Sequence, residues 1–580
     1  MTKLRTPGPS CLLLTHGRKP AGTSDLGFAK TACIVVAFCV AVAIALPAQT
    51  FNFKTYRFDG TDGGSPLAGL VQATDGNLYG TTQAGGAIGQ GTVFKITPSG
   101  TLTKLLSFCY CADGENPQAA LIQATDGNLY GTTPYPGGTV FKVTLSGIET
   151  VLSSDFAAQI VAPLVQATDG NFYGTTANGN PEGTVFKISP SGTLTTLYAF
   201  CSQSGCADGA FPQAGLVQGT DGNFYGTTQY GGINNCYIGC GTVFKITPIG
   251  RLTTLHSFCP LGGDCTDGSN PVAGLVQGTD GNFYGTTANG GPNTCYDQSH
   301  ERSVSCGTVF KITPTGALTT LHSFDSTDGG IPSAGLVQAT DGNFYGTTLY
   351  GGAKGANDGT IFKITPSGKL TTLYSFCSQS DCTDGSQSYA SLVQDTSGIF
   401  YGTTASGGLG DGTVFSLSVG LGPFVSFRPA GRPVGDVVEI LGQGFTGTTG
   451  VSFNGTPATF TVQSDTYLTA TVPAGASTGF VTVATDSGTL KSDKKFRVTP
   501  QILSFSPTSG PVGTKVVITG TSFTGATGVE LACKWPMSFT VDSDTQITAI
   551  VPADGTTGEL MVLGTPGGHV ESTAQFTVTP

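Results

Sequence analysis

Charged side chains are scarce in this sequence. Asp, Glu, Lys and Arg make up only 11% of its 580 residues, against about 25% in an average soluble protein. Lys and Arg number 26 against 37 acidic residues and form no basic run, so neither nucleic acid nor an anionic membrane surface is expected as a partner. Glycine is abundant instead, with 87 copies. Few long charged side chains and many turn formers favour an all-β protein.

Long apolar runs are equally rare. One run extends from Ala32 to Leu46, with small residues at Ala45 and Ala48 where it ends. It is short for a membrane span of about 20 residues. Residues 1–48 are therefore interpreted as an export signal, and an uncleaved N-terminal anchor is the alternative. No other membrane contact is expected, and the mature protein is expected outside the cell or on its outer surface.

Histidine is too scarce, at five residues, to accompany the 16 cysteines in zinc sites. Most cysteines outside the leader form close pairs of differing spacing, which favours disulfides in an oxidising compartment and predicts no metal or other cofactor. Cys109 and Cys111 are separated by one residue, so their pairing stays open. Cys533 has no cysteine near it in the sequence to pair with. The disulfide candidates are Cys201 with Cys206, Cys236 with Cys240, Cys259 with Cys265, Cys295 with Cys306, and Cys377 with Cys382.

One phrase recurs along the chain, and its fullest form is "GLVQATDGNFYGTT", from Gly335 to Thr348. Such repetition predicts a structural unit that stacks on or closes with copies of itself. Each copy contains two hairpin patterns, one turning at "DGN" and one at "PSG", so four short strands are predicted per copy. The Gln of the "LVQ" or "LIQ" step marks seven copies, at Gln72, Gln123, Gln166, Gln218, Gln277, Gln338 and Gln394.

The ends of the array predict a closed ring. The seventh copy stops after "GTVFSLSV", Gly412 to Val419, and lacks its fourth strand, whereas Phe53 to Phe58 near the start resemble that missing strand. Pairing the two would remove the exposed strand edges. Residues 51–419 are therefore predicted to form a seven-bladed β-propeller closed by an N-terminal strand. An open solenoid is the alternative.

This closure also predicts what each side of the ring carries. The "DGN" and "PSG" turns would share one side, and the loops between second and third strands and between copies would share the other. The loops of variable length and the paired cysteines all fall in the second group. Variable loops on a rigid frame are where binding usually resides.

From Gly422 the sequence changes character. Two stretches, 423–498 and 501–580, align with each other, for example Phe445 with Phe523 and Asp465 with Asp544. Their alternating runs of about 80 residues predict two immunoglobulin-like β-sandwiches.

The quoted phrases resemble a known bacterial repeat. "GLVQATDGNFYGTT" and "GTIFKITPSGKLTTLYSF" are similar to the GloVer tandem repeat of secreted choice-of-anchor proteins, over residues 51–419. This resemblance implies no established biochemical activity. Residues 423–498 and 501–580 resemble IPT/TIG domains, which implies spacer or contact modules of a bacterial surface protein. The sorting or anchoring tail common in the family is not found, so the mode of attachment stays open.

No catalytic constellation is found. Acidic residues recur in the turns and between copies, which suits turn chemistry better than paired catalytic carboxylates or calcium ligands. His256 and His322 occupy the position of Tyr198 and Tyr374 in other copies, so they are interpreted as strand residues. The loop Cys295 to Cys306 holds the densest polar group, Asp297, His300, Glu301 and Arg302. It is interpreted as an exposed polar loop, and a site of acid–base chemistry is the alternative.

Aromatic residues in the second-to-third-strand loops suit sugars or protein partners. The leading hypothesis is a secreted or cell-surface, non-catalytic recognition or adhesion protein that binds a glycan or a cell-envelope protein. An extracellular polysaccharide hydrolase or lyase and a structural envelope or matrix component are the alternatives; ligand identity and oligomeric state stay open. The candidate ligand-binding residues are Tyr135, Tyr230, Tyr237, Tyr296, Tyr350, Asp297, His300 and Arg302.

Overall fold

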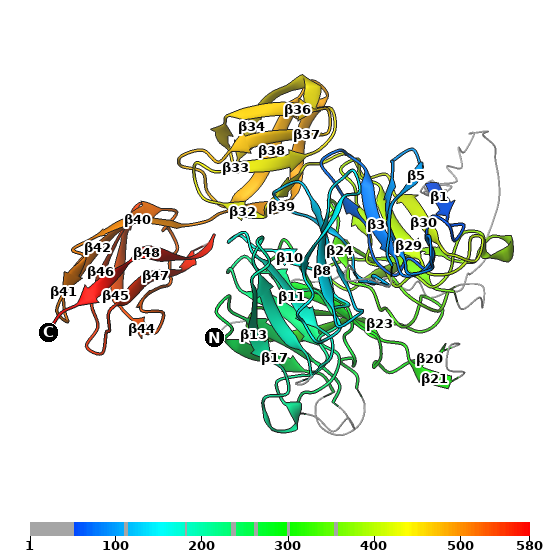
Figure 1. Ribbon diagram of the computed structural model, residues 1–580, viewed down its shortest axis with the longest axis horizontal. Coiled ribbons are helices and arrows are strands. Elements are labelled where there is room, and N and C mark those ends of the chain that lie inside the picture. Colours follow the sequence, from blue (N-terminus) through cyan, green and yellow to red (C-terminus); the bar gives the residue numbers. More distant parts are fainter. Residues whose placement is uncertain are drawn as a thin grey trace, which may run out of the picture. The chain divides into compact units, whose positions relative to one another are not determined.

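The computed structural model describes residues 52–580 except 110–113, 180–181, 234–238, 260–264, 298–301, 353–357 and 566; of residues 297 and 302 it describes the backbone. The predicted leader, residues 1–48, lies outside the described residues. Figure 1 draws the strands as arrows and colours the chain along its sequence, from blue to red. In the described ranges, no helix combines the length and apolarity needed to cross a bilayer. The short helical turns are η1 (Ser204–Cys206), η2 (Ser380–Cys382) and η3 (Phe445–Gly447).

The repeat array, residues 52–418, consists of antiparallel four-stranded sheets, one for each copy of the repeated phrase. The first three are β2 (Val71–Gln72), β3 (Leu78–Thr82), β4 (Thr92–Ile96) and β5 (Leu102–Ser107); β6 (Ile122–Gln123), β7 (Leu129–Thr133), β8 (Thr139–Val143) and β9 (Glu149–Ser153); and β10 (Val165–Gln166), β11 (Phe172–Thr176), β12 (Thr184–Ile188) and β13 (Leu194–Ala199).

The remaining sheets of the array follow the same order, and the fifth also carries a short hairpin of its own, β20 (Thr294–Asp297) with β21 (Arg302–Ser305). Their strands are β14 (Val217–Gln218), β15 (Phe224–Thr228), β16 (Thr242–Ile246) and β17 (Leu252–Ser257); β18 (Val276–Gln277), β19 (Phe283–Thr287), β22 (Thr308–Ile312) and β23 (Leu318–Ser323); β24 (Val337–Gln338), β25 (Phe344–Thr347), β26 (Thr360–Ile364) and β27 (Leu370–Ser375); and β28 (Val393–Gln394), β29 (Phe400–Thr404), β30 (Thr413–Ser418) and β1 (Asn52–Arg57).

The seventh sheet joins the two ends of the array. β1 pairs antiparallel with β30, from Asn52 opposite Ser418 to Arg57 opposite Thr413. The Phe53 ring stacks on Tyr374 of the sixth sheet, with ring centroids 3.9 Å apart. Residues 52–57 thus occupy the position that the sequence predicts for the missing fourth strand.

The repeated phrase explains how neighbouring sheets pack. Every residue of β25 is buried, and the Tyr345 ring packs on Phe400 of the next sheet, with centroids 4.3 Å apart. Gly346 is required at this point, because a Cβ there would lie 2.7 Å from the Phe362 ring and 2.8 Å from Leu336. The absence of a side chain at Gly346 therefore leaves room for the Phe362 ring to pack against β25.

A cycle of hydrogen bonds links every sheet of the array to the next. The Gln that ends each first strand accepts a hydrogen bond from a backbone N–H at the Thr following the first strand of the preceding sheet, as Gln123 does from Thr74 at 2.9 Å. The cycle closes where Gln72 accepts from Thr396 at 3.0 Å. The intermediate bonds join Thr125 to Gln166, Thr168 to Gln218, Thr220 to Gln277, Thr279 to Gln338, and Thr340 to Gln394.

Residues 426–578 form two sandwiches with the same strand order, each a four-stranded and a five-stranded sheet around its own core. The first contains β31 (Ser426–Arg428), β33 (Val437–Leu441), β37 (Tyr467–Thr471) and β36 (Phe460–Ser464), with β32 (Gly431–Arg432), β39 (Gly488–Val498), β38 (Gly479–Thr485), β34 (Thr448–Phe453) and β35 (Thr456–Ala458). The second contains β40 (Gln501–Ser506), β42 (Lys515–Thr521), β46 (Gln546–Ile550) and β45 (Ser538–Ser543), with β41 (Ser509–Gly510), β48 (Gly568–Val578), β47 (Gly558–Thr565), β43 (Gly528–Leu531) and β44 (Trp535–Pro536).

Candidate binding face

The loops between second and third strands lie at one end of the sheets, because antiparallel strands alternate in direction. The connections between sheets lie at the same end, which we call the loop face; the Asp-Gly turns lie at the other end, the turn face. Backbone hydrogen bonds join the loops into a continuous rim, as from Asn116 N–H to Gln90 O at 2.9 Å. Ser65 N–H donates to Asp411 O at 2.9 Å and closes this rim across the chain's first and seventh copies.

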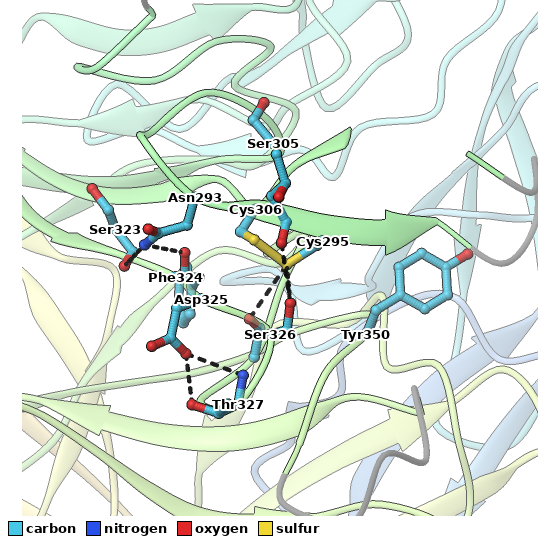
Figure 2. The surroundings of a disulfide bond; sticks show 12 residues. Asn293, Cys295, Ser305, Cys306, Ser323, Phe324, Asp325, Ser326, Thr327 and Tyr350 are labelled. Carbon is cyan, nitrogen blue, oxygen red and sulfur yellow. Dashed lines mark hydrogen bonds between the residues drawn. A yellow bond between two sulfur atoms is a disulfide. The ribbon is translucent and has the colours of Figure 1, made fainter. Parts of the chain in front are cut away.

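Disulfide bonds hold individual loops of this face. Four predicted pairs are confirmed, Cys201–Cys206, Cys259–Cys265, Cys295–Cys306 and Cys377–Cys382. Figure 2 shows the third of these, where the Ser326 hydroxyl lies 3.3 Å from Cys295 Sγ. The predicted Cys236–Cys240 bond and the pairing of Cys109 with Cys111 involve residues outside the described part of the chain.

The candidate tyrosines differ in exposure. Tyr135 is 42% exposed and Tyr296 49% exposed, whereas Tyr230 is half-buried against the Phe211 ring. Tyr350 is 1% exposed and packs with Ile331 and neighbouring apolar residues, beside the Cys295–Cys306 disulfide (Figure 2). The prediction that Tyr350 contacts a ligand is therefore wrong, because the adjacent sheet's loop covers its ring.

Three other candidates cannot be placed, since Cys236, Tyr237 and His300 lie outside the described residues. The backbones of Asp297 and Arg302 pair with each other at the end of the β20–β21 hairpin. That hairpin brings the two residues together in the longest loop of the face.

Exposed aliphatic residues on the loop face were missed by the sequence reasoning, which considered only aromatic ones. Ile88, Ile233 and Leu409 are exposed in second-to-third-strand loops, and Tyr389 is exposed in the connection before the seventh sheet. With Tyr135 and Tyr296 they form what we call the apolar rim, spread over several copies. Backbone hydrogen bonds hold the rim together, and disulfides also cross-link the segments of Tyr296 and Tyr389. Variable loops on a rigid frame are where binding usually resides.

The two strand histidines pair with carboxylates on the same face. His256 Nε2 lies 2.9 Å from Asp267 Oδ2, and His322 Nε2 lies 2.7 Å from Asp328 Oδ2. In the sixth copy the Tyr374 hydroxyl donates to Asp384 Oδ2 at 2.7 Å in the same register. The pairs therefore fasten the outer strand to the following loop, a role that either His or Tyr can fill.

This exchange between copies supplies a test. His322→Tyr is expected to leave stability within about 0.5 kcal/mol of the parent, since Tyr374 makes the same bond. His322→Leu is expected to cost roughly 1–3 kcal/mol, because Asp328 Oδ2 loses its bond to the imidazole while Oδ1 keeps only the Asp325 N–H. Leu106 occupies this register in the first copy. Urea unfolding of both variants measures the difference. Equal losses for Tyr and Leu would contradict a hydrogen-bonding role.

The Asp of each "DGN" turn is saturated with donors on the turn face. The carboxylate of Asp341 accepts from Asn343 Nδ2 at 2.7 Å, from the Tyr345 hydroxyl at 3.0 Å, and from Lys363 Nζ at 2.9 Å. Burial alone would raise the pKa of Asp341, but the hydrogen bonds from Asn343 and Lys363 outweigh it and lower the pKa. These contacts are turn chemistry, as the sequence predicts, and they occupy the oxygens that a cation would need.

The lowered pKa of Asp341 predicts a pH-dependent contribution to stability. The contribution is complete above the unfolded pKa of about 3.9 and is lost as the pH falls through the lower folded pKa. Asp341→Asn is expected to cost about 1–3 kcal/mol at neutral pH, since an amide N–H₂ would face Lys363. Urea unfolding should show this cost shrinking below about pH 4. Asp554→Asn, at an exposed site in the second sandwich, is the control; a cost independent of pH would contradict the assignment.

Two groups of side chains in the described part have ligating atoms close enough to hold a metal ion: Cys240, Cys259 and Cys265, and Asp358 with Cys377 and Cys382. Each group includes a disulfide, Cys259–Cys265 or Cys377–Cys382. Disulfide sulfurs are not thiolate ligands. The oxidised chain therefore uses these cysteines as cross-links.

The turn face is contacted by the first sandwich through two arginines. Arg497, buried in the structure, donates to Gly219 O at 2.6 Å and to Gln218 Oε1 at 3.1 Å. Arg428 donates to Gln123 Oε1 and Gln72 O. Burial lowers the pKa of each guanidinium to about 10, so both remain charged at neutral pH.

Linked four-stranded sheets followed by immunoglobulin-like sandwiches define an all-β protein with a propeller-like repeat array. The sequence matches the Gloeobacter/Verrucomicrobia repeat family over residues 40–238, 135–295 and 237–483, and the IPT/TIG domain over residues 500–578. Because the first matches cover more than half of the chain, the protein belongs to the Gloeobacter/Verrucomicrobia repeat family. No curated protein matches it.

Solved structures resemble parts of the chain. Virginiamycin B lyase from Staphylococcus aureus is 16% identical with a TM-score of 0.44, over 63% of this chain and 99% of that one. A streptogramin B lyase is 17% identical with a TM-score of 0.44, over 63% and 97%. A surface glycan-binding protein from Prevotella bryantii is 21% identical with a TM-score of 0.19, over 27% and 39%. At these values the similarity says nothing about what this chain binds or catalyses.

Proposed function

We propose that the protein is a secreted or cell-surface recognition protein, without catalytic activity, that binds a glycan or an envelope protein through the loop face. In this proposal residues 51–419 form a seven-bladed β-propeller closed by β1, and residues 423–498 and 501–580 are two IPT/TIG-type sandwiches. Residues 1–48 act as the export signal. The family match assigns no activity, so the binding function proposed here is an inference beyond that match.

The observation that carries the proposal is the apolar rim. Its exposed side chains come from loops of a rim held together by backbone hydrogen bonds, and disulfides also cross-link the segments that carry Tyr296 and Tyr389. A rigid loop loses less conformational entropy on binding than a free one, so these loops are suited to hold a partner. The turn face is engaged differently, since Arg428 and Arg497 of the first sandwich contact it.

The proposal is tested by immobilising the chain and probing it with a glycan panel and solubilised envelope fractions. Tyr135→Ser with Tyr296→Ser is expected to weaken capture of the bound partner at least roughly tenfold. The matched control is Ile148→Ser with Ile249→Ser, which removes exposed apolar side chains from turns of the turn face.

Three outcomes would overturn the proposal. Capture lost equally in both double variants would place the contact elsewhere, and absence of any captured glycan or envelope protein would leave no recognition function. Release of new polysaccharide ends by the parent chain would establish an enzyme instead.

A further inference from the structure

A cavity of about 810 Å³ lies where the inner strands of the repeat array meet the first sandwich. Its walls come from the first strands of several sheets, and its other side comes from Phe427, Ala430, Thr478 and part of β39. Pockets that hold small organic molecules have volumes of about 300–1,000 Å³. The cavity is therefore large enough for such a ligand.

The array side of the cavity is mainly apolar. Leu216, Leu275, Leu336 and Leu392 line it at successive sheets, with valines of the same strands. The glutamines between them are already engaged: the amide of Gln277 donates to Thr220 Oγ1 at 3.3 Å and to Gly281 O at 3.1 Å. The glutamine donors thus serve to join the sheets, and the leucines and valines would contact the body of a ligand.

The sandwich side of the cavity is cationic. Lys494, Lys495 and Arg497 of β39 line it. Phe496 between the last two is buried in the sandwich core, so alternation along the strand turns Lys495 and Arg497 to the opposite side, toward the array. Arg497 is bonded to uncharged oxygens, those of Gly219 and Gln218.

The acids that border the cavity do not cancel this charge, because each already has a cation of its own. Asp221 lies 2.9 Å from Lys245 Nζ, and Asp280 lies 3.1 Å from Lys311 Nζ. Lys494 has the adjacent Asp493 of β39 as its charge partner. These paired charges sum to zero, which leaves Lys495 and Arg497 of β39 in excess. An anionic group is therefore favoured at the β39 side of the cavity.

We propose that this cavity binds an amphipathic organic anion, a carboxylate on an unbranched apolar body such as a medium-chain fatty acid. The apolar body would lie along the leucines, and the carboxylate would lie at Lys495 and Arg497. This site differs from the loop face and is independent of the proposed recognition function.

The test uses the full described chain, residues 52–580, with decanoate as probe below its micelle concentration. Isothermal titration and thermal shift are expected to show saturable binding of decanoate and weaker binding of decanol and of inorganic phosphate by roughly tenfold or more. If decanol binds as tightly as decanoate, the cavity does not recognise the carboxylate, and the anionic part of the proposal is wrong. Phosphate binding as tightly would remove the apolar part, and no binding of decanoate would overturn it.

Variants locate the site. Lys494→Gln with Lys495→Gln is expected to weaken decanoate binding roughly tenfold, whereas Lys491→Gln, an exposed lysine of the same strand, should leave it unchanged. Decanoate binding should also survive Tyr135→Ser with Tyr296→Ser, which separates this proposal from the loop-face one. Equal binding by parent and the Lys494/Lys495 variant would overturn the assignment, and circular dichroism checks that every variant is folded.

Discussion

A chain that starts at residue 59 is expected to lose the fold that a chain starting at residue 52 retains. The deletion removes β1, the partner of β30 in the seventh sheet, over six paired residues. It also removes the Phe53 ring from its stack on Tyr374 and the fully buried Phe58 from its contact with Phe94. Loss of a buried Phe such as Phe58 costs about 3–5 kcal/mol, and a whole domain is stable by only about 5–15 kcal/mol.

The measurement compares residues 52–580 with residues 59–580 by calorimetry and size-exclusion chromatography. The shorter chain is expected to aggregate or to melt at least about 10 °C lower, because β30 becomes an exposed edge that pairs with other chains. A synthetic peptide of residues 50–60 should restore part of the loss by adding back the strand. A shorter chain that melts within a few degrees of the longer one would show that closure does not stabilise the array.

The repeated phrase made the strands predictable, because each copy carries its own turn signal. "DGN" and "PSG" place Gly at positive φ, as at Gly342 and Gly368. In the same copy the buried strand Phe344–Thr347 follows "DGN", and the mostly buried strand Thr360–Ile364 precedes "PSG". Disulfides were predictable for a similar reason, since the partners are close in sequence. Local signals thus disclosed the sheets and the loop face.

Contacts between distant residues were not predictable in the same way. Tyr350 occupies the same loop type as Tyr135, yet Ile331 and its neighbours in the adjacent connection cover it. The repeated Gln reads as a marker in the sequence, but only the structure shows that it joins each sheet to the next. In the first sandwich, Arg428 and Arg497 differ in no visible way from surface arginines, because their acceptors lie about 280 to 360 residues away.

Arg497→Ala is expected to release the first sandwich from the turn face while the repeat array stays folded. The substitution removes the charged donor from Gly219 O and Gln218 Oε1, which keep only the backbone N–H groups of Gly222 and Thr168 as donors. Each lost hydrogen bond to a charged group costs roughly 1.5–3 kcal/mol. Thr168 N–H also donates to Gln218, so this link of the cycle between sheets loosens as well. Hydrogen exchange should accelerate at the backbone amides around Thr168 and Gly219.

Two substitutions separate this docking role from a loss of charge alone. Arg432→Ala removes a half-buried arginine of the same sandwich whose described ion pair is with Asp436, at 3.9 Å, and it should leave exchange at Gly219 unchanged. Arg497→Lys keeps the charge but cannot present two parallel donors to Gly219 and Gln218. We expect it to restore less than half of the lost protection. A lysine ammonium supplies the positive charge but lacks the geometry for two parallel hydrogen bonds. Full protection in Arg497→Lys would therefore mean that the charge, rather than the paired hydrogen bonds, holds the sandwich on the array.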